Sequence, residues 1–393
     1  MNKIDEYYDI VVVGAGMIGA AMAIGLAAEG WKILLLEHTK PLPLDPVSKP
    51  DLRVSALNCT SVDLLKQLGV WNNVLKMRFA PYRRVEIWEQ KNSSVIFEAK
   101  SLGLPELGYM IENRILQLAL LEQFSQYSNS NLLCPAKLVA MQRYDQQWKI
   151  SLNNNQNIVA PLIITAEGAS SQVRSLAGIG SHGWQYPQSC LLITVKMKQP
   201  QQDITWQQFF PSGPRAFLPL FDHWACLVWY DKPARIRQLN ALPFKELKQE
   251  IILSFPDRLG SLDIVAKGSI PLSRHHANRY VDEGLALIGD AAHSIHPLAG
   301  QGVNLGYRDV DSLLKVLIYA KSHFLPCYDK KTLLIYQQDR ILDNKLMQIS
   351  MDVIYKIFSS QVNAVKSGRN LALMVVQKLH GIKKMLMKYV LGL

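Results

Sequence analysis

The 393-residue chain predicts an α/β fold, in which a parallel-sheet domain is interleaved with an antiparallel-sheet domain and followed by a helical C-terminus. Three observations support this prediction. A strand, glycine turn, helix and strand open the chain, short β-branched and aromatic runs fill residues 184–231, and GLALIGDAAH then repeats the strand-and-turn pattern before a mostly helical remainder. A chain of this length exceeds the usual limit for one hydrophobic core, so two domains are expected.

The opening elements form a βαβ unit. The apolar runs predict a strand over 9–13, a helix over about 18–29 and a second strand over 31–37. A proline-rich loop, LPLDPVSKPD, follows, and a helix is then expected across 61–68. The segment ENRILQLALLEQFSQY has 3.6-residue apolar spacing and predicts a further helix.

The middle of the chain has a different pattern. The runs SCLLITVKM, ITWQQFF, RAFLPLF and HWACLVWYD are separated by breakers such as PSGP. Short runs of this kind are typical of antiparallel strands, so they predict a sheet in a second domain.

Composition limits the functions that the chain can have. Apolar residues make up 49% and charged residues 19%, which excludes a disordered chain. The five cysteines include no C-x-x-C pair, which favours a reducing compartment and predicts neither a zinc site nor a disulfide framework. Residues 10–28 carry no charge, but acidic residues precede them and four glycines interrupt them, so we expect no signal peptide and no membrane span. These features predict a cytoplasmic protein.

The net charge of +11 is concentrated in the C-terminal tail. No Asp or Glu follows Asp352, whereas seven Lys or Arg do. Such a tail suits an anionic membrane surface at least as well as a phosphate backbone, and we expect no nucleic-acid partner. An apolar stripe runs through the tail at helical spacing, with Lys383, Lys384 and Lys388 beside or across from it. The stripe fits either a docked terminal helix or a helix lying on the membrane.

A glycine-rich turn follows the first strand and opens the first helix. It comprises Gly14, Ala15, Gly16, Met17, Ile18 and Gly19. In such a turn the first glycine permits the tight bend, the second lets backbone N–H groups approach a pyrophosphate, and the third allows close helix packing. Glu37 ends the second strand, where a carboxylate would accept a hydrogen bond from a ribose hydroxyl. A tightly packed core helix would not account for Glu37, so the unit predicts dinucleotide binding.

The stretch GDAAHSIHPLAGQGVN at residues 289–304 favours a flavin over a nicotinamide cofactor. Asp290 follows a strand and could bind the hydroxyl groups of a ribityl chain. The next residues have small side chains, so a planar ring could lie against their main chain, and a helix over about 303–318 would direct its positive end at the ring edge. The loop comprises Pro297, Gly300, Gln301 and Gly302, and the helix begins at about Val303 and Asn304.

These motifs together resemble those of a known family. GAGMIG, LRVSAL and GDAAHSIHPLAGQGVNLG are similar to the motifs of the class A flavoprotein aromatic hydroxylases, which have the p-hydroxybenzoate hydroxylase-like fold. PYRRVEIWE, WQYPQSC, TWQQFFPSGPRAFLPL and HPLAGQGVNLGYRDVD resemble, more narrowly, segments of the ubiquinone-biosynthesis hydroxylases.

The resemblance implies a reaction. FAD, reduced by transiently bound NAD(P)H, would react with O2 to give a C4a-hydroperoxyflavin, which hydroxylates the benzoquinol ring of a polyprenylated ubiquinone precursor. It also implies membership of a ubiquinone-biosynthesis complex and peripheral contact of the C-terminal helix with the inner face of the cytoplasmic membrane. The predicted division is 1–75 with 100–180 and 278–325 for the Rossmann-like FAD-binding domain, 76–99 with 181–277 for the substrate domain, and 326–393 for the C-terminal helices.

The resemblance also implies roles for further residues. Arg53 would reach the pyrophosphate or the ring edge, and Arg114 would help to bind the cofactor. The family's Asp-Gly pair is replaced here by Glu167-Gly168, so the contact of that carboxylate is expected to be shifted or lost, and Arg174 follows at the family's spacing.

The substrate pocket is expected at residues that the resemblance indicates, namely Phe217, Leu218 and Pro219.

No catalytic acid or base and no metal ligand are assigned. His293 and His296 lie three residues apart without a nearby Glu or Cys, and we expect turn histidines satisfied by the backbone. Three alternatives remain open at this point. They are a related hydroxylase acting at another ring position, a flavin dehydrogenase or oxidase, and a flavin-holding, non-catalytic member of the biosynthetic complex.

Overall fold

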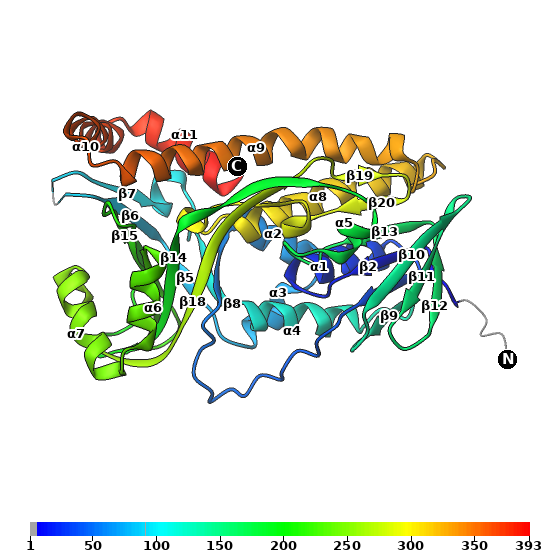
Figure 1. Cartoon of the computed structure of the whole chain (residues 1–393), viewed down its shortest axis with the longest axis horizontal. Helices are drawn as coiled ribbons and strands as arrows, with labels where there is room; N and C mark the ends of the chain where they lie inside the picture. The colour runs from blue at the N-terminus through cyan, green and yellow to red at the C-terminus, as the bar shows by residue number, and fades with distance from the viewer. Residues whose placement is uncertain (1–5, 91) are drawn as a thin grey trace.

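The computed structural model describes residues 6–90 and 92–393. Two lobes are joined by a pair of long strands, and a long helix runs along both lobes (Figure 1). One lobe is built on a six-stranded sheet in the order β19-β20-β13-β2-β3-β9. Its strands are β2 (Ile10–Val13), β3 (Ile33–Leu36), β9 (Ser130–Leu133), β13 (Leu162–Thr165), β19 (Val281–Asp282) and β20 (Leu285–Leu287). All pairs in this sheet are parallel except β19 with β20.

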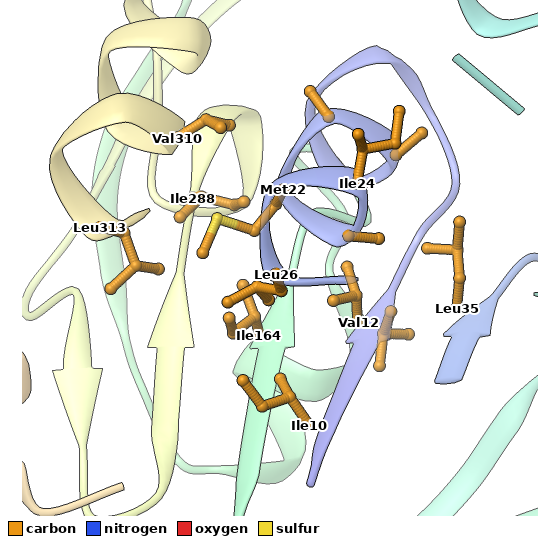
Figure 2. Close-up of a cluster of buried hydrophobic side chains, with 14 of the residues drawn as sticks. Ile10, Val12, Met22, Ile24, Leu26, Leu35, Ile164, Ile288, Val310 and Leu313 are labelled. Atoms are coloured by element: carbon orange, nitrogen blue, oxygen red, sulfur yellow. The ribbon is translucent and has the colours of Figure 1, made fainter. Parts of the chain in front are cut away.

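Helix α1 (Met17–Ala28) confirms the predicted βαβ unit and lies in the middle of this lobe. The strands on either side of it read IVVV and ILLL and are fully buried, as expected for a parallel sheet covered on both faces. Figure 2 shows Met22 and Leu26 of α1 in one cluster with Ile288 and Leu313, which belong to the later part of the chain. The front and rear segments of the chain therefore share one hydrophobic core.

The second lobe is built on an eight-stranded sheet in the order β21-β18-β14-β17-β16-β15-β6-β7. The predicted antiparallel runs form β14 (Ser181–Met197), β15 (Ile204–Gln208), β16 (Arg215–Pro219) and β17 (Trp224–Asp231). The other strands are β6 (Arg84–Trp88), β7 (Ser94–Glu98), β18 (Leu262–Ala277) and β21 (His293–Ser294). β14 and β18 pair along most of their length and form the arch between the lobes (Figure 1).

Two smaller sheets and several helices complete the fold. β4 (Val54–Asn58), β8 (Gly108–Glu112) and β5 (Ala80–Tyr82) form one sheet, and β1 (Glu6–Tyr7), β12 (Asn157–Ala160), β11 (Gln147–Leu152) and β10 (Leu138–Tyr144) form the other. The helices are α2 (Cys59–Gln67), α3 (Trp71–Leu75), α4 (Asn113–Phe124), α5 (Gln172–Leu176), α6 (Pro233–Ala241), α7 (Phe244–Ser254), α8 (Gly302–Ser322), α9 (Lys330–Ser359), α10 (Asn363–Lys378) and α11 (His380–Leu391). The helices expected over 61–68, in ENRILQLALLEQFSQY and over 303–318 are confirmed as α2, α4 and α8.

The C-terminal tail differs from the single terminal helix that its stripe suggested. The helix breaks at Leu379, whose φ of −89° and ψ of 86° lie outside the helical region, and continues as α11 in a new direction (Figure 1). Among the described residues, no helix is both long enough and apolar enough to cross a bilayer.

Candidate functional site

The three glycines of the turn after β2 are needed for different physical reasons. Gly14 has φ +100°, and a Cβ there would lie 2.7 Å from the carbonyl oxygen of Ala166. A Cβ at Gly19 would lie 1.9 Å from the carbonyl oxygen of Gly14. A Cβ at Gly16 would meet nothing within 4 Å. Packing therefore requires the first and third glycines, whereas the second faces open space that a ligand can enter.

Glu37 joins this turn to the end of β3. Its side chain is buried, and its carboxylate accepts hydrogen bonds from the backbone N–H of Ala15 at 2.8 Å and of Thr39 at 3.0 Å. An ionised carboxylate has about four acceptor sites, so capacity is left for a ribose hydroxyl. Met17 and Ile18 begin α1, which has no side-chain cap and no acidic residue in its first turn. The backbone N–H groups of its first turn have no partner within the helix and can bind an anion.

The rear glycine stretch packs directly onto this turn. A Cβ at Gly306 would lie 2.7 Å from Cδ1 of Ile18, and a Cβ at Gly289 would lie 3.3 Å from its Cγ2. Gly302 begins α8, whose first turn has no side-chain cap, and a Cβ there would meet nothing within 4 Å. The starts of α1 and α8 therefore pack together around Ile18, and each helix begins at a glycine whose Cβ position is open.

Asp290 lies at this junction. Its side chain is accessible to solvent, yet surrounding protein raises the pKa of its carboxyl group by desolvation, against the opposing charges of His293 and Arg53. Arg53 is also exposed, so the two side chains are available to a ligand.

A buried ionic network holds the turn that carries Asp290. Asp309 accepts hydrogen bonds from the backbone N–H of Gly289 at 3.0 Å and from Nε of Arg340 at 3.0 Å, and its carboxylate lies 2.6 Å from Nε2 of His293. Burial alone would raise the pKa of Asp309, but His293 and Arg340 lower it to about 2. His293 is therefore paired with a carboxylate, and the expectation of a backbone partner was wrong for it.

The loop between β21 and α8 is fixed from two sides. The buried side chain of Asn304 donates to the carbonyl oxygen of Ala56 at 2.9 Å and accepts from the backbone N–H of Asn58 at 3.0 Å and the hydroxyl of Ser61 at 2.8 Å. These bonds direct the Asn304 side chain toward β4 and α2, so only its backbone is left for the ring surface that the sequence predicted. Gly300 has φ +61°, and a Cβ there would lie 3.4 Å from Cβ of Ala56.

The other predicted loop residues fall into two groups by exposure. Gln301 is buried, whereas Pro297 and Val303 are half-buried.

Two of the basic or acidic residues implied by the resemblance bind the protein itself. The guanidinium of Arg114 donates to both carboxylate oxygens of Asp51 at 2.8 and 2.9 Å and to the carbonyl oxygen of Pro43 at 3.2 Å. It thereby holds the loop that leads to Arg53. Glu167 accepts from the backbone N–H of Val173 at 2.9 Å, among other donors of its own segment, so its carboxylate caps α5.

Arg174 connects α5 to the glycine stretch at 289–304. Its guanidinium donates to the carbonyl oxygen of Ala291 at 2.9 Å and to that of Ala169 at 2.8 Å. Since Ala291 follows Asp290 in the chain, Arg174 supports the position of that carboxylate.

The three predicted pocket residues lie on different faces of the eight-stranded sheet. Phe217 stacks on Trp206 with ring centroids 5.4 Å apart, in the core beneath α6 and α7. Leu218 lies on the opposite face, with Cys190 and Tyr230. Successive strand residues alternate between faces, so Pro219 shares the face of Phe217. Leu218 alone among the three therefore lies on the face of Cys190 and Tyr230, and the pocket stays a prediction for all three residues.

His296 is a feature that sequence reasoning missed. Its side chain is 0% exposed, and neither ring nitrogen has a hydrogen-bond partner among the described residues. The predicted backbone partner is absent there as well. Burial lowers the pKa of His296 to about 4, so the ring is neutral at pH 7. The described residues include no cluster of three His, Cys, Asp or Glu placed to hold a metal ion.

Comparisons with known proteins agree with this geometry. The model of the FAD binding domain family matches residues 7–338. The chain is 50% identical to the 3-demethoxyubiquinol 3-hydroxylase of Escherichia coli (strain K12), with 98% of each chain covered. It is 32% identical to the ubiquinone hydroxylase UbiL of Rhodospirillum rubrum, over 99% of this chain and 90% of that protein.

Solved structures match the fold. The p-nitrophenol 4-monooxygenase PnpA of Pseudomonas putida DLL-E4 superposes with a TM-score of 0.79 at 15% identity, covering 98% of this chain and 99% of that one. PqsL of Pseudomonas aeruginosa, described as a probable FAD-dependent monooxygenase, superposes with a TM-score of 0.78 at 19% identity, covering 94% of this chain and all of that one.

Proposed function

Because the chain belongs to the FAD binding domain family, and within it to the ubiquinone-biosynthesis hydroxylases, we propose that it hydroxylates the benzoquinol ring of a polyprenylated ubiquinone precursor with FAD, NAD(P)H and O2. The comparisons confirm the predicted family, the p-hydroxybenzoate hydroxylase-like fold and the monooxygenase class. The domain boundaries and the individual cofactor contacts stay predictions.

The single observation that supports this proposal most is an open glycine position at the start of each of two helices that pack together. Gly16 and Gly302 face space that no protein atom fills, and each lies at the start of an uncapped helix. The chain fits FAD if the turn at 14–19 holds the pyrophosphate, Glu37 the adenosine ribose and Asp290 the ribityl hydroxyls.

The loop at 297–304 then lies against the flavin ring, and the positive end of α8 favours negative charge at the ring edge. When bound, FAD supplies the hydride chemistry with NAD(P)H and the activation of O2. The protein binds and orients both reactants and excludes water.

The substrate side is an apolar wall. The face of the sheet that meets the cofactor lobe presents Cys190, Leu192 and Leu218, and Val54 and Ala56 of β4 pack in the same cluster. An apolar wall with few polar groups suits a quinol ring and the start of its prenyl tail. An electron-rich ring needs no protein nucleophile, so no catalytic nucleophile is assigned.

The C-terminal helices provide a surface for the membrane in which a prenylated substrate dissolves. Large apolar side chains of α9, α10 and α11 stand in solvent, among them Leu342 at 71% and Met385 at 63% exposure. The chain after Asp352 has no carboxylate side chain, whereas Lys384 and Lys388 lie beside the apolar positions. Apolar and cationic groups together favour an anionic lipid surface. We therefore propose that the protein lies on the inner face of the cytoplasmic membrane.

The test is steady-state oxidation of NADPH and NADH with a short-chain quinol analogue. We expect substrate-stimulated oxidation and one hydroxylated product per reductant consumed. Flavin reduction by the substrate itself, without NAD(P)H, would indicate a dehydrogenase instead, and the absence of any stimulated oxidation would refute the monooxygenase proposal. Complementation of strains that each lack one ring hydroxylase, with the accumulated intermediate identified by mass, assigns the ring position.

A further inference from the structure

A cage of aromatic rings surrounds His296. The imidazole lies between Tyr230, with centroids 5.9 Å apart and planes at 24°, and Tyr355, at 5.3 Å and 25°. Tyr186 meets its edge at 4.5 Å and 77°. The ring is therefore held in a fixed orientation by packing, and its two nitrogens contribute no hydrogen bond to the described structure.

The hydroxyl groups of Tyr186 and Tyr230 are engaged elsewhere. Tyr186 donates to the carboxylate of Asp352, which Arg274 also binds. Tyr230 donates to the carbonyl oxygen of Pro297 at 3.3 Å. A buried polar group without a partner is costly, and a native structure that keeps one needs a reason for it.

The position of His296 supplies the reason. It immediately precedes Pro297, which begins the loop proposed to lie against the flavin ring. It also stacks on Tyr230, which lies directly opposite Cys190 across the β14–β17 pair, on the sheet face proposed as the substrate wall. A hydrogen-bonding group is thus placed at the boundary between an apolar substrate wall and the cofactor loop.

We propose that His296 forms a hydrogen bond with a hydroxyl group of the quinol ring and so positions that ring beside the 297–302 loop. The inference rests on the proposed function, because it takes a hydroxylated aromatic ring as the ligand. A neutral imidazole can accept a hydrogen bond from a ring hydroxyl or donate one to its oxygen. Accepting one would increase the electron density of the ring that must attack an oxygen atom.

The matched control is His275 on β18. Both of its ring nitrogens are also buried without a hydrogen-bond partner among the described residues, and burial likewise lowers its pKa to about 4. Its backbone pairs with Ser294, and it belongs to neither the substrate wall nor the cofactor loop. Replacement by phenylalanine therefore removes two buried ring nitrogens at either site. Only His296 is proposed to contact the substrate.

The experiment measures the dissociation constant of a short-chain quinol analogue for the FAD-bound protein, anaerobically and without NAD(P)H. We expect His296→Phe to retain FAD and to keep or raise the thermal midpoint, while the dissociation constant rises about tenfold. His296→Gln, which keeps a donor and an acceptor, should recover part of the loss, and His275→Phe should bind the quinol as the wild type does.

A second readout uses the wild-type protein labelled with nitrogen-15 histidine. The ring-nitrogen signals of His296 should shift when the quinol analogue is added. Unchanged signals, or unchanged affinity in His296→Phe, would overturn the inference. Loss of folding in His296→Phe that His296→Gln restores would overturn it too, because the nitrogens would then serve the fold. If the wild type binds the quinol through His296 but forms no product, the proposed function fails and this inference stands.

Discussion

Replacing Gly16 by alanine separates ligand binding from folding. Gly16 has φ −71°, which alanine adopts freely, and the added Cβ meets no atom of the described protein within 4 Å. We therefore expect the free energy of unfolding without FAD to fall by no more than about 1 kcal/mol, the usual cost of alanine at an N-cap position. The methyl group would instead occupy the space in which a pyrophosphate approaches the start of α1.

The expected loss of FAD affinity follows from the hydrogen bonds at stake. Each bond to a charged group contributes about 1.5–3 kcal/mol, so displacing one corresponds to about a 10- to 100-fold rise in the FAD dissociation constant. The assay is titration of the apoprotein with FAD, followed by flavin fluorescence, together with urea unfolding of the apoprotein.

Two other glycines serve as controls. Gly19→Ala would place a Cβ 1.9 Å from the carbonyl oxygen of Gly14, so it should destabilise the apoprotein itself, by about 1–3 kcal/mol or more. Gly368→Ala lies at an exposed position in α10 and should leave FAD affinity unchanged. If Gly16→Ala binds FAD as tightly as the wild type, the pyrophosphate does not lie at this turn.

Two further predictions concern the buried network and the C-terminal surface. Asp309→Asn should lower the free energy of unfolding by about 1.5–3 kcal/mol, because it removes a buried charged hydrogen bond to Arg340, which keeps Asp343 as an ion-pair partner. Since folding lowers the pKa of Asp309 from 3.8 to about 2, its contribution is present above pH 4 and is lost as the pH falls toward 2, so urea midpoints of the two proteins should converge over that interval. Charge reversal by Lys384→Glu with Lys388→Glu should lower co-sedimentation with vesicles of anionic lipid by at least about tenfold, whereas Lys245→Glu on α7 should not. If the wild type, the double variant and Lys245→Glu sediment equally, the membrane contact does not involve Lys384 and Lys388.

The local elements of the cofactor lobe could be predicted from the sequence. The strands on either side of the first glycine turn are continuous apolar runs, and the contact that requires Gly19, with the carbonyl oxygen of Gly14, lies within the turn itself. The start of α8 was predicted in the same way, from small residues before a helical pattern. These signals are local, so they can be recognised in the sequence without knowledge of the tertiary structure.

Features that depend on distant partners could not be predicted. β18 reads LDIVAKGSIPLSRHHA, in which Gly268, Pro271 and several charges hide the alternation, and only pairing with β14 makes it a strand. The network around Asp309 joins residues from η3 (Gly289–Ala291), α8 and α9. The unpartnered nitrogens of His296 have no sequence signal at all, because whether a histidine finds a partner depends on its packing.

The measurement that tests the central claim most directly is the visible spectrum of the purified protein after it has been saturated with FAD and desalted. If the turn at 14–19 and the stretch at 289–304 form one site, flavin absorbance should stay with the protein in a stoichiometric amount. A colourless protein, with all of the FAD in the small-molecule fraction, would contradict it.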